Sequence, residues 1–291
     1  MWYHDTASSS CTLVSASKAL TFPTMNTIHP EPLVQIHLRG AVLRLVLNRP
    51  RARNALSVGL MAALQNALDE AAANNQARVI VLAANGPVFS SGHDLKEMTE
   101  RRQAPDRGAA AFAALFAQCA QLMQTIVRHP KPVIAEVQGT ATAAGCQLVA
   151  SCDLAIASSS AHFATPGVNI GLFCSTPMVA LSRNVSRKHA MEMLLTGEMV
   201  SADEARRIGL VNHVADPAAL EGKTMELAHL IASKPAATVR IGKEAFYRQL
   251  EMGLSEAYDY ASRVMTENML AAEAQEGIGA FVEKRDPKWP V

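Results

Sequence analysis

Residues 87–96 read Pro-Val-Phe-Ser-Ser-Gly-His-Asp-Leu-Lys, a glycine turn between a compact apolar strand and the start of a helix. Asp94 and Glu97 have the spacing of a helix N-cap and its N3 partner. Backbone N–H groups at a helix start have no partner inside the helix, so they can bind an oxygen anion. The same arrangement is also an ordinary connection in α/β proteins, so this stretch alone leaves both interpretations open.

A second segment of this kind runs over residues 139–145, between Gly139 and Gly145. Its small residues let the backbone approach a ligand closely just before another helix. Two such helix starts supply two N–H donors, and two donors directed at one point form an oxyanion hole.

On either side of these segments, short apolar runs typical of strands alternate with segments whose apolar residues recur at helical spacing. A hairpin is expected around Arg39-Gly40, with strands at 41–47, 78–83, 132–137 and 153–157 and helices after Ser57 and at 109–127, 145–151 and 187–196. Repeated βα units predict a layered α/β core. We expect a flexible extension over residues 1–30, the core over 31–217 and a helical C-terminal domain over 218–291.

Composition excludes several classes of protein. The 291 residues are 49% hydrophobic, which suits a well-buried core, and the net charge of +1 makes nucleic acid an unexpected partner. Five cysteines without a C-x-x-C pair favour free buried thiols and predict no metal site. The longest apolar run, residues 108–117, is too short to cross a bilayer, so no membrane partner is expected. The N-terminus lacks the pattern of a secretory signal, and Met25 is an alternative start.

The two glycine segments and their surroundings strongly resemble the crotonase, or enoyl-CoA hydratase/isomerase, superfamily. The matching motifs, in the family's order from about residue 33 to the end, are Asn48-Arg49-Pro50, Asn54-Ala55-Leu56, Ser91-Gly92-His93-Asp94-Leu95, Lys131-Pro132-Val133-Ile134-Ala135, Gly139, Gly145-Cys146, Cys152-Asp153, Met193-Leu194-Leu195-Thr196-Gly197, Ser201-Ala202, Ala205, Gly209-Leu210-Val211, Glu276-Gly277 and Ala280-Phe281-Val282-Glu283-Lys284-Arg285.

The resemblance implies a spiral of ββα units, followed by C-terminal helices that assemble a homotrimer or a dimer of trimers. It implies no bound cofactor, because coenzyme A enters as part of a thioester substrate. The family's two oxyanion donors fall on the N–H groups of His93 and Ala144. Contacts to coenzyme A are implied for Ala52, Arg53, Ala55, Leu95, Phe281 and Lys284, of which Phe281 and Lys284 reach a neighbouring subunit's coenzyme A.

The chain departs from the family at both acid/base positions. Hydratases of the family carry glutamates where this sequence has Gln147 and Gly167. Hydration needs a base for the water and an acid for Cα, each typically worth about 10² to 10⁴ in rate. An amide cannot exchange that proton, although Gln147 can orient a water or a polar substrate group. Gly167 is also expected to be open to a left-handed conformation that a side chain would strain.

No replacement acid is evident. His93 could act as an acid or base, because an imidazole ordinarily titrates near neutral pH. The alternative role for His93 is that of a surface or structural histidine in a turn. His162 is expected to be exposed at a strand start, and Cys146 and Cys174 are either pocket-lining or buried core thiols. Polar contacts in a pocket wall are assigned to Asn169, Ser175 and Thr176.

The sequence therefore predicts an acyl-CoA-binding enzyme that stabilises a thioester enolate, with hydration weak. The alternatives are an isomerase, a decarboxylase, a thioester hydrolase acting through water or His93, a non-catalytic acyl-CoA-binding regulatory protein, and an RNA-interacting family member that the charge balance disfavours. The expected compartment is the cytoplasm, or the mitochondrion in a eukaryote.

Overall fold

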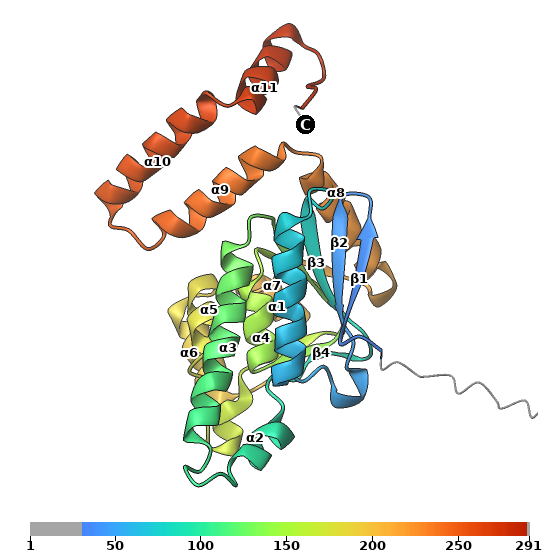
Figure 1. Ribbon diagram of the computed structural model, residues 1–291, viewed down its shortest axis with the longest axis vertical. Coiled ribbons are helices and arrows are strands. Elements are labelled where there is room, and N and C mark those ends of the chain that lie inside the picture. Colours follow the sequence, from blue (N-terminus) through green and yellow to red (C-terminus); the bar gives the residue numbers. More distant parts are fainter. Residues whose placement is uncertain (1–30, 290–291) are drawn as a thin grey trace, which may run out of the picture. The chain divides into compact units, whose positions relative to one another are not determined.

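The computed structural model describes residues 31–289, of which residues 32–289 lie in one compact unit (Figure 1). The extension predicted at 1–30 and the alternative start at Met25 lie outside the described residues. The domain boundary expected at residue 217 stays a prediction.

The larger sheet has six strands in the order β1-β2-β3-β5-β7-β10. The bounds are β1 Val34–Arg39, β2 Val42–Leu47, β3 Val79–Ala84, β5 Val133–Val137, β7 Leu154–Ser158 and β10 His213–Ala215. β1 and β2 form the predicted antiparallel hairpin, and the other neighbours are parallel. Helices cover both faces, so β2 and β5 are buried along their whole length. Each strand carries one charged residue, and these two, Arg44 and Glu136, pair with each other at 2.8 Å.

A smaller sheet has the order β4-β6-β8-β9, with β4 Val88–Ser90, β6 Thr140–Thr142, β8 His162–Ala164 and β9 Val200–Ser201. Of this sheet, only the strand start at His162 is predicted from the sequence, and His162 is exposed there as expected. Its strands have two or three residues, too few to show a period-two pattern. This sheet nevertheless positions the candidate site, because β4 and β6 run parallel and each ends at one of the glycine segments.

The helices of the core are α1 Val58–Ala73, α2 Leu95–Arg101, α3 Ala109–Arg128, α4 Ala144–Ser151, α5 Pro177–Asn184, α6 Arg187–Thr196, α7 Ala202–Arg207 and α8 Leu220–Ala232, with single turns η1 Pro50–Ala52, η2 Pro166–Ile170 and η3 Pro217–Ala219. Successive side chains of β2 and β3 point to opposite faces of the sheet. Leu43 and Ile80 belong to the apolar cluster with α1 and α3, whereas Val42 and Val79 pack against α8 on the other face.

The cap predicted at Asp94 is present, and two further helix ends are capped. Asp94 begins α2 and accepts from the N–H groups of Lys96 and Glu97, Ser201 begins α7, and Gly197 ends α6 at φ +64°. In a capping box, the Glu97 side chain would accept a hydrogen bond from the Asp94 N–H. In this structure the Glu97 carboxylate accepts instead from Val58 N at 3.1 Å. Glu97 thus ties the start of α2 to the start of α1.

Within the described residues, α3 is the one helix long and apolar enough to cross a membrane. Its inward face, Leu115, Cys119, Leu122, Met123 and Ile126, is buried in the same apolar cluster as α1. It therefore serves as a core helix in this chain.

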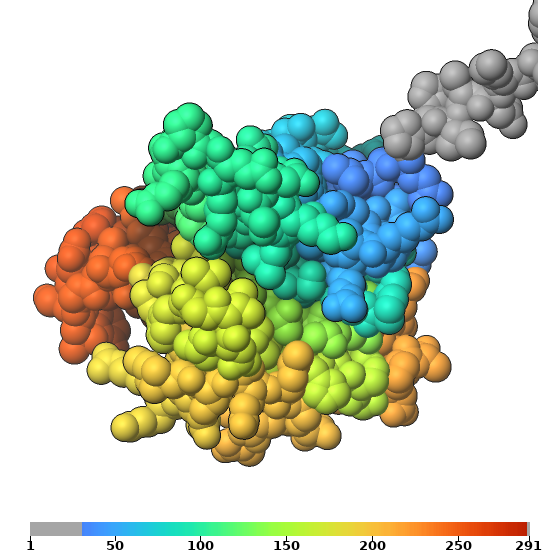
Figure 2. All heavy atoms as spheres, turned by 90° about the horizontal axis from the view of Figure 1, so that it is seen from below, coloured from blue at the N-terminus to red at the C-terminus, as the bar shows by residue number. Residues whose placement is uncertain are grey.

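The chain ends in an arm of three helices, α9 Ala236–Gln249, α10 Leu254–Met269 and α11 Ala272–Glu283. Figures 1 and 2 show α10 and α11 (red) at the margin of the chain, with much of their surface uncovered. Large apolar side chains are exposed along the arm: Phe246, Leu250, Leu254, Tyr258, Met265, Met269, Leu270, Ile278, Phe281 and Val282. These side chains lie outside the core of the single chain.

A buried ion pair fixes α9 to the core. The Lys243 ammonium donates to Asp153 Oδ2 at 2.7 Å, and Tyr247 donates to Asp153 Oδ1 at 2.9 Å. Asp153 Oδ2 also accepts from Val133 N at 2.6 Å, so Asp153, which directly precedes β7, also holds the start of β5. The Asp153 and Lys243 side chains are 14% and 7% exposed, so the pair is largely shielded from water.

Asp153→Ala is expected to lower the free energy of unfolding by about 3 to 5 kcal/mol, because it leaves the buried Lys243 charge unpaired. The matched control is Glu251→Ala, which breaks an exposed pair with Arg183 and should change stability by less than about 1 kcal/mol. Urea denaturation at equal protein concentration measures both. Equal losses in the two variants would contradict the anchoring role of Asp153.

Candidate functional site

The turn after β4 brings the two glycine segments together. Gly92 has φ +88°, and a Cβ placed on it would lie 2.9 Å from Ala143 Cβ and 3.2 Å from Ala144 N. Gly145 is equally constrained, since its Cβ would lie 2.2 Å from the Ser90 carbonyl oxygen. Both positions require glycine because backbone packs directly on backbone. The start of α4 therefore touches the residue before His93.

The N–H groups of His93 and Ala144 are both unused. Ala144 is the first residue of α4, so its N–H has no acceptor within the helix. Ala143 before it takes φ +50° and ψ −119°, a sparsely populated conformation for a residue with a side chain. Among residues 31–289, no hydrogen bond uses either N–H group as donor. The two predicted oxyanion donors thus lie at neighbouring helix starts.

The His93 imidazole turns inward rather than into solvent. Its Nδ1 lies 3.4 Å from the Leu56 carbonyl oxygen, and the ring meets Phe116 edge to face with centroids 5.6 Å apart. Burial lowers the pKa of His93 and outweighs the opposing effects of the Leu56 carbonyl and of Glu97. A carbonyl only accepts, so we assign the proton to Nδ1. Nε2 is then a buried lone pair without a partner among the described residues.

Gln147 lies one helical turn after Ala144 and is 5% exposed. Its Oε1 is 3.9 Å from the Cys119 sulfur on α3. Burial raises the pKa of Cys119 to about 11, so the thiol stays protonated and donates. No residue in the described range accepts a hydrogen bond from Gln147 Nε2.

Gly167 is buried in η2. A side chain is excluded there by neighbouring atoms and not by the backbone conformation of Gly167. A Cβ would lie 2.7 Å from the Leu172 carbonyl oxygen and 2.9 Å from the Cys174 sulfur. The expectation of a left-handed conformation is wrong at Gly167: Gly171, four residues later, has φ +76°. The η2 turn needs the positive φ at its end, where Gly171 caps it.

The cysteines are confirmed as free buried thiols in the described part of the chain, at Cys119, Cys146, Cys152 and Cys174. Cys11 lies outside it. Burial raises the pKa of Cys146 to about 12 and also raises that of Cys174, so neither forms a nucleophilic thiolate near neutral pH. Among the possible wall residues, Asn169 and Ser175 are exposed and Thr176 is half-buried. No group of three His, Cys, Asp or Glu suited to a metal ion occurs within residues 31–289.

The segment implied in coenzyme A contacts borders the oxyanion turn. Ser91 N donates to the Arg53 carbonyl at 3.1 Å, and Leu56 N donates to the Gly92 carbonyl at 2.7 Å. Ala52 and Ala55 belong to this segment, and half-exposed Leu95 begins α2 directly after the turn. These four positions therefore gather around His93.

Phe281 and Lys284 are not brought to this turn. Phe281 is 85% exposed on α11, and Lys284 caps that helix at φ +55°. Figure 1 shows α11 and α2 at opposite ends of the described chain. The contact of these two residues with a neighbouring subunit's coenzyme A, which the resemblance implies, stays a prediction.

Two residues that organise the site carried no role in the sequence analysis. Asn54 is fully buried, and its amide donates to the carbonyls of Asn85 and Val88 at 2.9 and 2.8 Å. Arg49 pairs with Asp94 at 2.9 Å and donates to the Ala55 carbonyl at 3.0 Å. In the sequence, Asn54 and Arg49 could be noticed only as members of the family motifs Asn48-Arg49-Pro50 and Asn54-Ala55-Leu56. These motifs identify the family but do not indicate which groups the two side chains contact.

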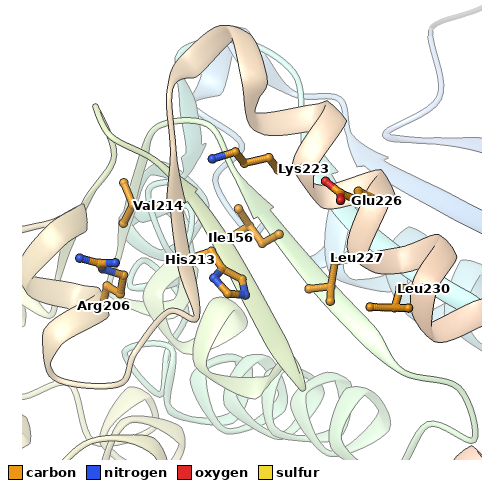
Figure 3. Close-up of a pocket in the computed structure, with 8 residues that line it drawn as sticks. All are labelled: Ile156, Arg206, His213, Val214, Lys223, Glu226, Leu227 and Leu230. Atoms are coloured by element: carbon orange, nitrogen blue, oxygen red, sulfur yellow. The ribbon is translucent and has the colours of Figure 1, made fainter.

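Two cavities are described, and the larger of the two contains no residue of the two glycine segments in its lining. It measures about 300 Å³ between β7, β10, α7 and α8, with the side chains of Arg206, His213, Lys223 and Glu226 at its rim (Figure 3). A smaller cavity of about 200 Å³ lies between α1, α2 and α3 and is lined by Val58, Glu97 and Leu115, among others. The smaller cavity shares Glu97 and the face of α3 with the surroundings of His93.

The family model described as enoyl-CoA hydratase/isomerase matches residues 37–290. The chain belongs to the enoyl-CoA hydratase/isomerase family. It is 49% identical over 260 residues to human enoyl-CoA hydratase domain-containing protein 3, mitochondrial, covering 89% of this chain and 84% of that protein. The corresponding mouse protein is 48% identical over 260 residues, covering 89% and 85%.

Solved structures of the enoyl-CoA hydratase/isomerase family share the fold. An enoyl-CoA hydratase from Mycobacterium smegmatis is 51% identical with a TM-score of 0.85, covering 89% of this chain and 99% of that one. The human domain-containing protein 3 structure is 47% identical with a TM-score of 0.84, covering 88% and 100%. The predicted α/β crotonase fold, with its C-terminal helices, is confirmed.

Proposed function

We propose that the protein binds acyl-CoA thioesters and holds the thioester carbonyl oxygen between the N–H groups of His93 and Ala144. The observation that carries this proposal is the contact of two helix starts through Gly92 and Gly145, where both N–H groups lack an acceptor among residues 31–289. Two fixed backbone dipoles stabilise the negative charge that develops on that oxygen in an enolate. Ala52, Arg53, Ala55 and Leu95 would border the coenzyme A moiety.

Proton transfer is the weak part of such a site. Gln147 and Gly167 supply no carboxylate, and the neutral His93 Nε2 is the buried proton acceptor nearest to the turn. Enolate stabilisation needs no titrating side chain, so this capability survives without the two glutamates. Isomerisation, decarboxylation and thioester hydrolysis all pass through charge on the same oxygen and remain candidate reactions. Non-catalytic binding of acyl-CoA is the second candidate function, favoured by the two missing carboxylates.

A turnover screen separates these candidates. Short-chain, medium-chain and malonyl-type CoA thioesters are incubated with the full chain and read by mass spectrometry. A gain of water, a loss of carbon dioxide or release of free coenzyme A identifies hydration, decarboxylation or hydrolysis. Binding of these thioesters without any mass change would favour the non-catalytic candidate, and absence of binding at millimolar ligand would contradict both.

We also infer that the arm of α9, α10 and α11 assembles a homotrimer or a dimer of trimers, supported by its exposed apolar side chains. Leu254 and Phe281 are 78% and 85% exposed, and no residue of α10 is buried in the single chain. Covering such side chains stabilises an assembly by roughly 25 cal/mol per Å² of apolar surface.

Light scattering at micromolar concentration is expected to give at least three chains per particle. Leu254→Glu is expected to shift the particle toward the mass of one chain, because it places a charge in the covered apolar surface. Glu256→Gln on the same helix is the control and should keep the assembly. A strict monomer for the parent chain would overturn this inference.

The compartment is proposed from the relatives. The human and mouse proteins are described as mitochondrial, and we infer the same compartment for this family member.

A further inference from the structure

The larger cavity lies at the edge of the six-stranded sheet. β10 is last in the strand order, so among residues 31–289 one of its edges has no neighbouring strand. His213 and Val214 are consecutive in β10 and point to opposite faces of the sheet, yet both line the cavity. The cavity therefore reaches around the free edge of β10, between α7 and α8. Its volume of about 300 Å³ is at the lower end for ligand pockets, which measure roughly 300 to 1,000 Å³.

One part of the cavity lining is apolar. Leu227 and Leu230 are three residues apart and share a face of α8, and Figure 3 shows them next to each other near Ile156 of β7. Leu230 is 56% exposed, so its side chain is largely uncovered in the single chain. An aliphatic group of a ligand that covers these side chains leaves water, which favours binding.

The other part of the cavity lining is basic. Arg206 on α7 and Lys223 on α8 carry positive charges, and the His213 ring adds a further N–H donor. Within the described part of the chain, neither Arg206 nor Lys223 has an ion-pair partner. The next residue on α7 differs, since Arg207 is paired with Glu204. The positive charge at the cavity is therefore not balanced by a partner in the chain.

The charge of the lining selects the charge of the ligand. Glu226 is the one acidic residue that lines the cavity, and Figure 3 shows the Lys223 ammonium turned away from its carboxylate. With His213 neutral, Arg206, Lys223 and Glu226 give the lining a net charge of +1, which one carboxylate neutralises. A phosphate monoester carries about −1.5 to −2 at pH 7, so part of its charge would stay uncompensated beside Glu226.

We propose that this cavity binds a monocarboxylate with a short aliphatic chain. The basic residues Arg206 and Lys223 attract and bind the carboxylate, because guanidinium and ammonium groups are strong donors to carboxylate oxygens. The aliphatic chain packs against Leu227, Leu230 and Ile156. This site shares no residue with the oxyanion turn, and the inference does not rest on the proposed acyl-CoA function.

A ligand-observed NMR titration of the full chain with hexanoate at low ionic strength tests the proposal. We expect saturable binding in the millimolar range, because the basic side chains are exposed and their charges are screened. Acetate, which lacks the chain, should bind at least about tenfold more weakly. Hexanol, which lacks the charge, should bind about threefold to fivefold more weakly, and hexyl phosphate should also bind more weakly than hexanoate.

Substitutions at the cavity give changes of opposite sign. Arg206→Gln and Lys223→Gln should each weaken hexanoate binding about threefold to fivefold, the range for an exposed charge pair. Glu226→Gln should strengthen it about twofold, because it removes a like charge. Arg207→Gln on the same helix is the control and should leave the affinity unchanged. All four side chains are exposed, so these variants should keep the parent's urea denaturation midpoint.

Three results would overturn the inference. Hexanoate that binds equally well to the double variant Arg206→Gln/Lys223→Gln, or that butyryl-CoA displaces, would lie outside this cavity. Tighter binding of hexyl phosphate than of hexanoate would contradict the preference for a monocarboxylate. Absence of saturable hexanoate binding by the parent would overturn the site itself, whereas the acyl-CoA proposal is tested separately by butyryl-CoA.

Discussion

Gly92→Ala is expected to remove most of the affinity for acyl-CoA and to lower any turnover by about 10² to 10³, the usual effect of losing one oxyanion donor. The new Cβ would lie 2.9 Å from Ala143 Cβ and 3.2 Å from Ala144 N, so the two helix starts must separate. Separation spoils the convergence of the His93 and Ala144 N–H groups. Calorimetry with butyryl-CoA and the turnover screen measure the two losses.

The control for Gly92→Ala is Gly40→Ala in the β1–β2 hairpin. Gly40 also has a positive φ, +59°, but its Cβ would meet only the His229 ring at an ordinary 3.8 Å. Both variants carry the cost of a left-handed alanine, roughly 1 kcal/mol, and only Gly92→Ala disturbs the turn. If Gly40→Ala loses acyl-CoA affinity to the same extent, the effect reflects general destabilisation and contradicts the role given to Gly92.

Gln147→Glu is expected to raise the hydration of crotonyl-CoA by about 10² or more over a slow parent, since one acid/base group typically contributes about 10² to 10⁴. The glutamate has nearly the shape of the glutamine, and the surrounding α4 helix is unchanged. Steady-state loss of the enoyl chromophore measures the rate. Robust turnover by the parent that is unaffected by Gln147→Ala would show that another group already supplies the base.

Gly167→Glu is expected to lower the rate rather than restore it. The Leu172 carbonyl and the Cys174 sulfur occupy the space that its Cβ needs, and a backbone carbonyl cannot move aside cheaply. The double variant with Gln147→Glu should therefore be slower than Gln147→Glu alone. A double variant that gains a further factor of about 10² would contradict the crowding at Gly167.

The parts of this fold that the sequence predicted are those with long periodic patterns. Strands of five or six mostly apolar residues such as β2 and β5, and helices as long as α1, carry enough repeats to be recognised. The cap at Asp94 was predictable because it depends on a single residue type at a fixed position. The residues of the oxyanion turn were found through their glycines and through the family motifs.

The remaining features depend on contacts between distant segments. The small sheet escaped prediction because its strands have only two or three residues, yet it aligns the two glycine segments. The contact between Cys119 and Gln147 joins residues 28 apart on different helices, and no local pattern indicates it. The crowding at Gly167 likewise depends on how residues 172–174 return over η2, so the sequence suggested backbone strain where the structure has steric exclusion.

The most direct test of the central claim is the infrared band of the thioester carbonyl in butyryl-CoA labelled with ¹³C at that carbon. Two N–H donors polarise the carbonyl, so the band should move to lower wavenumber when the ligand binds the parent chain. In Gly92→Ala, any bound ligand should give a band close to that of free butyryl-CoA. A bound ligand whose carbonyl band is unchanged in the parent would contradict an oxyanion site at His93 and Ala144.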